Sequence, residues 1–235
     1  MEYGKQGQGH SDGDPGLYFA LYEGHAPAVT AFIEGLKGLG LNPQQIADIV
    51  AAKDSNGTPG LCLALQNGHA PAVTAFIEGL KGLGLNPQQI ADIVVAKNVD
   101  GTPGLYLALQ NGHAPAVTAF IEGLKGLGLN PQQIADIVAA KNRYGTPALY
   151  GALQDGDAPA VTAFIEGLKG LGLNPQQIAD IVVAKDSDGT PGLRLTWQNK
   201  PATKAAYMNG LAGLQKSNLI TAEQVANMRS EAAKY

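Results

Sequence analysis

Apolar residues recur at helical spacing in a segment that returns several times along the chain. The apolar residues of one copy stand at positions i, i+3, i+4 and i+7: Val73, Phe76, Ile77 and Leu80. This spacing places them on one face and predicts an amphipathic helix. Ala70 and Pro71 mark its start, since proline suits the first turn of a helix.

Two shorter helices are predicted on either side of this one. The earlier helix follows Thr58 and Pro59, which fit an N-cap and a first helical position, and Gly68 ends it. The later helix opens at Asn86, and Gln89 stands three residues further on, as in a capping box. Each copy therefore predicts three short helices.

The three-helix segment repeats with a constant period. The sequence Gly57-Thr-Pro-Gly returns at residues 101 and 189 and, with Ala148 in place of the last glycine, at residue 145. Gly13-Asp-Pro-Gly is an earlier relative, so that each start lies 44 residues after the last. Periods of about 20–50 residues are typical of solenoids. We predict an all-α repeat solenoid of 44-residue units, with about three short helices per unit. Its single domain spans residues 13–235, and its units are 13–56, 57–100, 101–144, 145–188 and 189–235. Residues 1–12 are expected to form a flexible tail or an expression remnant.

The two ends of the repeat array differ. Thr221 and Gln224 open a polar helix that runs to Lys234, and this predicts a C-terminal cap with one wet face. No matching cap stands before the first unit. We therefore expect a further domain upstream, and self-association through the open end is the alternative.

One stretch of the unit resembles a known repeat. Residues 101–113, GTPGLYLALQNGH, are similar to the ankyrin signature G-x-T-P-L-H-x-A followed by N-G-H. Gly104 is an extra residue, Tyr106 replaces the usual His, and the unit has 44 residues rather than about 33. Expanded units of this kind resemble the C-terminal ankyrin region of bacterial type III secreted effectors of the OspC/CopC type.

That resemblance implies a function for the chain. It suggests a docking module that binds a host protein, with a caspase as partner, after secretion by a type III system into the host cytosol. In that family a separate N-terminal domain modifies host caspases with NAD, and these residues contain no such domain. The chain is therefore predicted not to be an enzyme. Without the resemblance, the sequence indicates a soluble cytoplasmic protein.

Composition and charge narrow the alternatives. The 235 residues carry a net charge of −4 and contain no apolar run long enough to span a membrane, so neither a nucleic acid nor a membrane is expected as partner. The phrase LNPQQIADIV resembles the opening of a TAL effector repeat, but the basic stripe that DNA tracking requires is missing. The near-identity of the copies keeps a further alternative open, which is a structural or designed scaffold without a specific partner.

Candidate catalytic and metal-binding residues have simpler explanations. His25, His69 and His113 stand in phase, but stacked helices lie about 8–10 Å apart and the three cannot share one zinc ion. We interpret them as turn residues that pack or form hydrogen bonds. Cys62 is the single cysteine and has no histidine in phase to act as base. No catalytic, cofactor-binding or metal-binding residue is predicted.

Variation between copies points to a binding surface. Change is concentrated in the turn before each Gly-Thr-Pro and in the first helix, where for example Leu107 becomes Gly151. In an ankyrin stack these places are the finger tips and the exposed concave helix face, where partners bind. Tyr, Trp and Arg are also common among interface hot spots. The predicted partner-binding residues are Tyr18, Tyr22, Cys62, Val99, Tyr106, Arg143, Tyr144, Tyr150, Arg194 and Trp197.

Overall fold

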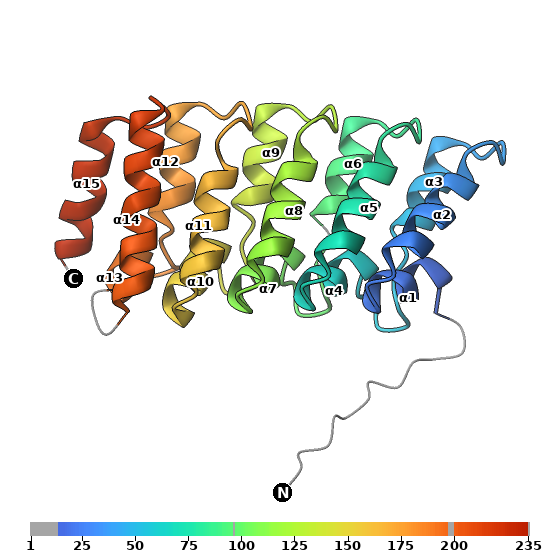
Figure 1. Ribbon diagram of the computed structural model, residues 1–235, viewed down its shortest axis with the longest axis horizontal. Coiled ribbons are helices and arrows are strands. Elements are labelled where there is room, and N and C mark those ends of the chain that lie inside the picture. Colours follow the sequence, from blue (N-terminus) through green and yellow to red (C-terminus); the bar gives the residue numbers. More distant parts are fainter. Residues whose placement is uncertain (1–13, 96, 197–199, 235) are drawn as a thin grey trace, which may run out of the picture.

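The computed structural model of the protein describes residues 14–95, 97–196 and 200–234. Within this part of the chain, fifteen helices stack side by side in an elongated row and no strand is present (Figure 1). The helices pack mainly on their neighbours in the row, as in a helical repeat solenoid. The sequence prediction of an all-α solenoid is confirmed.

Three parallel rows of helices make up the solenoid (Figure 1). The first row contains α1 (Gly16–Tyr22), α4 (Gly60–Gln66), α7 (Gly104–Gln110), α10 (Ala148–Asp155) and α13 (Gly192–Leu195). The second row contains α2 (Ala26–Leu36), α5 (Ala70–Leu80), α8 (Ala114–Leu124), α11 (Ala158–Gly167) and α14 (Pro201–Lys216). The third row contains α3 (Pro43–Val50), α6 (Pro87–Val94), α9 (Pro131–Val138), α12 (Pro175–Val183) and α15 (Ala222–Ala233).

The second row forms the core of the solenoid. Its helices make the most extensive contacts with one another, and the apolar stripe predicted for residues 73–80 is buried. Phe76 and Ile77 have no exposed surface. Burial of side chains of this size stabilises the fold by roughly 1.5–3 kcal/mol each.

The third helices begin as the sequence predicts. The Asn86 side chain accepts a hydrogen bond from the Gln89 backbone N–H at 2.9 Å, and the Gln89 side chain accepts one from the Asn86 backbone N–H at 3.0 Å. The same capping box opens α3, α9 and α12, and Thr221 with Gln224 forms one at α15. Each box satisfies two backbone donors that a helix start leaves without partners.

The first helices begin one residue later than predicted. Pro59, not Thr58, is the N-cap of α4, and no side chain caps it. The backbone N–H of Thr58 instead donates to Oδ1 of Asp54 at 2.8 Å. Thr58 therefore belongs to the loop before the helix, and the prediction of a threonine cap is wrong.

A contact between isoleucine and glycine sets the spacing of the second row. A Cβ placed on Gly79 would lie 2.7 Å from Cδ1 and 2.9 Å from Cγ2 of Ile33, so only glycine leaves room for that side chain. The same pairing joins Gly123 to Ile77 and Gly167 to Ile121. By contrast, no atom lies within 4 Å of a Cβ placed on Gly35.

Substitution of these glycines with alanine should therefore have opposite effects. Gly79→Ala should lower the free energy of unfolding by about 1–3 kcal/mol, because the added methyl group overpacks against Ile33. Gly35→Ala should raise it by about 0.5 kcal/mol, because alanine is the better helix former and the space is open. Urea unfolding of the two variants measures both changes. An equal loss in both would show that the contact does not limit packing.

Candidate functional site

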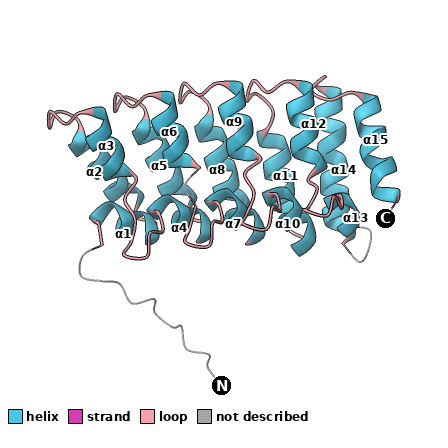
Figure 2. Ribbon diagram, turned by 180° about the vertical axis from the view of Figure 1, so that it is seen from behind, coloured by secondary structure: helices cyan, strands magenta, loops and turns pink. Residues whose placement is uncertain are grey.

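A short loop that we call a finger follows each of α3, α6, α9 and α12. The four fingers are residues 53–59, 97–103, 141–147 and 185–191, and an isolated antiparallel bridge joins the first and last residue of each. They connect the third row of helices to the first row, as the view from behind shows (Figure 2). Asp54, Asn98, Asn142 and Asp186 occupy the same position in the four fingers. The Oδ1 atom of each accepts two backbone N–H groups of its own finger at 2.8–3.0 Å.

An open hollow lies between the second and third fingers. Its volume is about 540 Å³. It is lined by Asn98, Asp100, Thr102, Tyr106, Leu107, Gln110, Asn142, Arg143, Tyr144, Thr146 and Gln154. The hollow thus combines polar finger residues with residues of α7 and with Gln154 of α10, and we name it the finger hollow.

The rim of the finger hollow carries the exposed aromatic and basic side chains. Tyr144 is 70 % exposed, and Val99 on the neighbouring finger is 62 % exposed. Arg143 donates from Nη2 to Oδ1 of Asp100 at 2.5 Å, and its guanidinium lies 5.5 Å from the ring centroid of Tyr144. The ion pair between neighbouring fingers holds Arg143 beside the aromatic ring.

Four of the predicted residues in the first helices are buried, not exposed. Tyr18, Cys62, Tyr106 and Tyr150 have 1–8 % of their surface exposed. The exposed helix face that variation between copies predicted is therefore wrong for these residues. Their side chains lie between neighbouring first helices and the following finger, so that alanine at these positions tests the fold before it tests binding.

The buried tyrosines fasten the first helices to the fingers. The Tyr18 hydroxyl donates to Oδ2 of Asp54 at 3.2 Å, and the Tyr150 hydroxyl donates to Oδ2 of Asp186 at 2.9 Å. Burial raises the pKa of Tyr150 to about 12, and the hydrogen bond to Asp186 adds to this shift. Burial also raises the pKa of Tyr106, whose hydroxyl interacts with Asn142.

The Tyr106 side chain explains one change between copies. A Cβ placed on Gly151 would lie 3.2 Å from the Tyr106 hydroxyl oxygen. Gly151 occupies the position that Leu107 holds in the previous unit, and the absence of a side chain there leaves room for the Tyr106 ring. These two positions therefore contact each other across the boundary between units.

Cys62 is a core residue. Its Sγ lies 3.8 Å from the Thr102 carbonyl oxygen, toward which it donates a weak hydrogen bond, and the residue is 1 % exposed. Burial raises the pKa of its thiol to about 12, so that little of the reactive thiolate forms near neutral pH. This environment suits a structural thiol.

The remaining predicted residues lie apart from the finger hollow. Tyr22 stacks on Tyr18 with ring centroids 6.3 Å apart, at the end of the solenoid where α1 lies. Arg194 is half-buried on α13, near Tyr150 and the last finger. Trp197 lies outside the described residues. Of the predicted set, Tyr106, Arg143 and Tyr144 line the same hollow, and Val99 stands beside it.

Several residues of the finger hollow were not predicted. Asp100 pairs with Arg143 across 43 positions, and their opposite charges in neighbouring fingers were the signal in the sequence. Gln110 and Gln154 also line the hollow. Gln110 and Gln154 occupy the same position in neighbouring copies and do not vary, so variation between copies did not indicate them.

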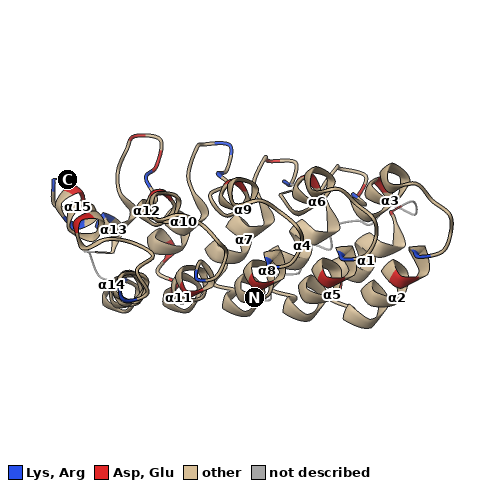
Figure 3. Cartoon of the chain, turned by 90° about the horizontal axis from the view of Figure 1, so that it is seen from above, with Lys and Arg blue, Asp and Glu red and all other residues tan. Residues whose placement is uncertain are grey.

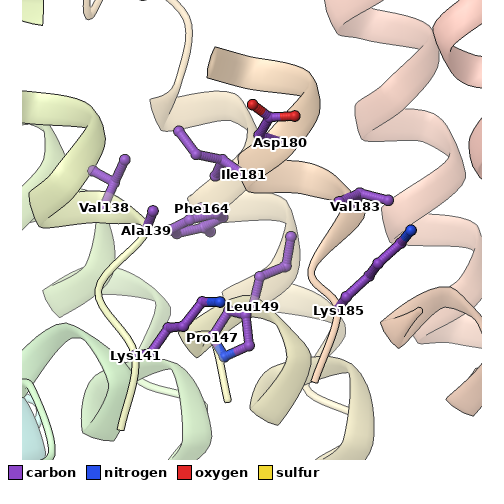
Figure 4. Close-up of a pocket in the computed structure, with 10 residues that line it drawn as sticks. All are labelled: Val138, Ala139, Lys141, Pro147, Leu149, Phe164, Asp180, Ile181, Val183 and Lys185. Carbon is purple, nitrogen blue, oxygen red and sulfur yellow. The ribbon is translucent and has the colours of Figure 1, made fainter. Parts of the chain in front are cut away.

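A second set of clefts lies between the third helices, which make few contacts with one another. Figure 4 shows the cleft between α9 and α12, with Lys141 and Lys185 at its sides and Phe164 at its base; its volume is about 180 Å³. Comparable clefts of about 310 and 260 Å³ lie between α3 and α6 and between α12 and α15. Their recurrence indicates a consequence of the wide spacing of the third helices, not a specialised site.

Charges of both signs are distributed along the solenoid (Figure 3). An exposed lysine–glutamate ion pair lies at the end of each of α2, α5, α8 and α11, with N–O distances of 2.5–2.7 Å. The picture shows no continuous basic stripe along the described part of the chain.

The histidines of neighbouring units lie apart from one another. His69 packs on Gly24 and His113 on Gly68, one unit apart. No group of three metal-ligating side chains gathers among the described residues, and none of the described helices is long and apolar enough to cross a membrane.

Compared with known protein families and with curated proteins, the chain matches none of them. The likeness to ankyrin repeats of secreted effectors therefore rests on the quoted residues alone.

Removal of the Tyr150 hydroxyl tests its part in fastening the last finger. Tyr150→Phe should lower the free energy of unfolding by about 1–2 kcal/mol, because Asp186 loses a half-buried donor. The difference from wild type should shrink as the pH rises from 10.0 through about 12, because the folded state holds the phenol proton more tightly than the unfolded state. Urea unfolding over this pH range measures both effects.

Tyr144→Phe is the matched control for that measurement. Tyr144 is exposed, and its change should stay within about 0.5 kcal/mol. Equal stability of Tyr150→Phe and wild type would show that the hydroxyl contributes nothing to the finger.

Proposed function

We propose that the chain is a non-enzymatic protein-binding module, and that it binds its partner through the finger hollow and the finger tips beside it. The observation that carries the proposal is the exposed cluster of Val99, Arg143 and Tyr144 on two neighbouring fingers. Exposed apolar and aromatic side chains of this size, gathered on adjacent loops, are typical of interaction sites.

The physical properties of this cluster suit recognition of a protein. Tyrosine and arginine supply large contact areas and are common among hot-spot residues. Asp100 already holds Arg143 in place, so binding immobilises one fewer long side chain. The finger hollow beside them can receive a side chain of the partner, and Asn98, Gln110 and Gln154 offer hydrogen-bonding groups along its walls.

The architecture supports the same proposal. We infer that the structural unit is the 44-residue sequence copy, an expanded ankyrin-like unit in which a short finger replaces a longer hairpin. The resemblance of residues 101–113 to the ankyrin region of OspC/CopC-type effectors suggests the substrate-docking part of a secreted effector. Its partner would then be a host caspase, met in the host cytosol.

The near-identity of the copies favours a second candidate, which is a structural or designed scaffold without a specific partner. Residues 25–50, 69–94 and 113–138 are the same string. A scaffold of this kind needs no particular residues on its finger tips, whereas a binding module does. The two candidates therefore differ in the effect of finger-tip substitutions.

Binding of purified host caspases to the full chain tests the proposal. The triple variant Val99→Ser/Arg143→Ala/Tyr144→Ala should lose about 30-fold or more in affinity, the change expected when hot-spot residues are truncated. It should melt near wild type, because the side chains are exposed and the ion pair is solvated. Isothermal titration calorimetry and thermal melting measure the two effects.

A matched variant on another finger separates the site from general effects. Ser55→Ala/Asn56→Ala changes two exposed residues of the first finger and should bind like wild type. If no caspase binds, the inferred partner is wrong. If the triple variant binds a caspase as well as wild type does, the finger hollow is not the site.

A further inference from the structure

Four asparagines of the chain are followed directly by glycine, and this pair of residues can react with itself. The backbone nitrogen that follows an asparagine can attack the side-chain amide, and glycine hinders the attack least because it has no Cβ. The four pairs are Asn56–Gly57, Asn67–Gly68, Asn111–Gly112 and Asn209–Gly210. Since all four have the same reacting atoms, a large difference in their reactivity must come from the fold.

The surroundings of the four glycines differ. A Cβ placed on Gly57 would meet no atom within 4 Å apart from its chain neighbours. The other three glycines are packed against side chains of adjacent units. The nearest atoms to a Cβ placed on Gly68, Gly112 and Gly210 would be those of His113 at 2.7 Å, Asp157 at 2.8 Å and Ile165 at 2.7 Å. Only the first of the four reacting backbone segments therefore has room to move.

The asparagine side chains differ in the same way. Nδ2 of Asn67 donates to the Tyr22 carbonyl oxygen at 3.3 Å, and Nδ2 of Asn111 donates to the Gln66 carbonyl oxygen at 2.9 Å. Asn209 lies within α14. By contrast, the Asn56 side chain is exposed and forms no hydrogen bond with the described residues. Its amide is free to turn toward the next backbone nitrogen.

The backbone at Asn56 belongs to the exposed tip of the first finger. The Gly57 N–H donates to the backbone oxygen of Asp54 at 3.0 Å, and this turn bond has to open before the nitrogen can attack. Opening one turn of an exposed loop costs less free energy than opening part of a helix or its packed end. The fold thus protects three of the four pairs and leaves the first accessible.

We propose that Asn56 is a modification site, at which the side-chain amide is lost spontaneously. The Gly57 nitrogen bonds to Cγ of Asn56 while the bond between Cγ and Nδ2 breaks, and the ammonia that leaves takes up the proton of the Gly57 N–H. Water is the co-reactant that opens the resulting cyclic imide. Cleavage at Cγ gives aspartate, and cleavage at the backbone carbonyl carbon gives isoaspartate.

The last finger shows how the aspartate product fits. Its sequence, Asp186-Ser-Asp188-Gly189, is the one that the first finger would carry after the reaction. The backbone N–H of Asp188 donates to Oδ1 of Asp186 at 3.0 Å, as the N–H of Asn56 does to Oδ1 of Asp54. The aspartate product therefore preserves the finger and adds one negative charge to its tip.

The isoaspartate product changes the finger more deeply, because it inserts a methylene group into the backbone. The insertion lies between the N–H groups of Asn56 and Thr58, which donate to Oδ1 of Asp54 at 3.0 and 2.8 Å. One carboxylate oxygen holds both groups, so the longer backbone disturbs this arrangement. The same insertion lengthens the loop that the bridge between Lys53 and Pro59 closes.

Incubation of the full chain in water enriched in heavy oxygen tests the proposal, because the new carboxylate takes one oxygen atom from water. Peptide mass spectrometry then gives the rate at each asparagine. Asn56 in the folded chain should react about tenfold or more faster than Asn67, Asn111 or Asn209, because those three require a larger part of the structure to open.

The same chain unfolded in urea is the matched control. Unfolding removes the packing around the glycines, so the four sites should then react at comparable rates, and the incubation lasts until each has reacted by half. A preference for Asn56 that persists in urea would show that its sequence neighbours single it out, not the fold. Equal rates in the folded chain, or an unchanged Asn56, would overturn the proposal.

The two products are distinguished in the first finger itself. Asn56→Asp stands for the aspartate product, and its Thr58 amide should exchange hydrogen as slowly as in the wild type. The isoaspartate form, separated by chromatography, should lose this protection. Loss of protection in both would show that the last finger is no guide to the product. None of these outcomes depends on the proposed binding of a partner.

Discussion

The packing of an isoleucine side chain onto a glycine of the next unit is the contact on which the structure depends. It occurs four times between consecutive second helices, and a Cβ on any of these glycines would lie 2.7–2.8 Å from the isoleucine. The close approach makes the second row the most tightly packed part of the solenoid, while the third helices stay further apart and leave clefts between them. The same spacing brings neighbouring fingers within reach of each other, so that Arg143 can pair with Asp100.

A contact of this kind gives the solenoid a direction. Each second helix packs its glycine against the preceding unit and its isoleucine against the following one, so that these contacts form only when the units follow one another in order. The two ends of the row are therefore chemically different. Lys204 is exposed on α14, and Phe32 and Leu39 are exposed in the first unit, although their counterparts Phe76 and Leu83 are buried.

Features that depend on a few adjacent residues could be predicted from the sequence. The capping box of Asn86 and Gln89 and the apolar stripe of α5 are local patterns, and both are present in the structure. The position of Tyr150 could not be predicted in this way, because its burial depends on the finger that follows and on the carboxylate of Asp186. Variation between copies indicated exposure there, but the Tyr150 side chain is buried against the following finger. The finger hollow was predicted only at its rim, because Gln110 and Gln154 do not vary between neighbouring units.

The central claim is that the fold is held together by contacts between consecutive units and not by each unit alone. Native-state hydrogen exchange of the backbone amides in the second helices tests it most directly. We predict the greatest protection in α5 and α8, which pack on a second helix on both sides, and clearly lower protection in α2, which packs on a second helix on one side only although its sequence is the same. Equal protection of α2, α5 and α8 would contradict it, because stability would then follow the sequence of each helix rather than its neighbours.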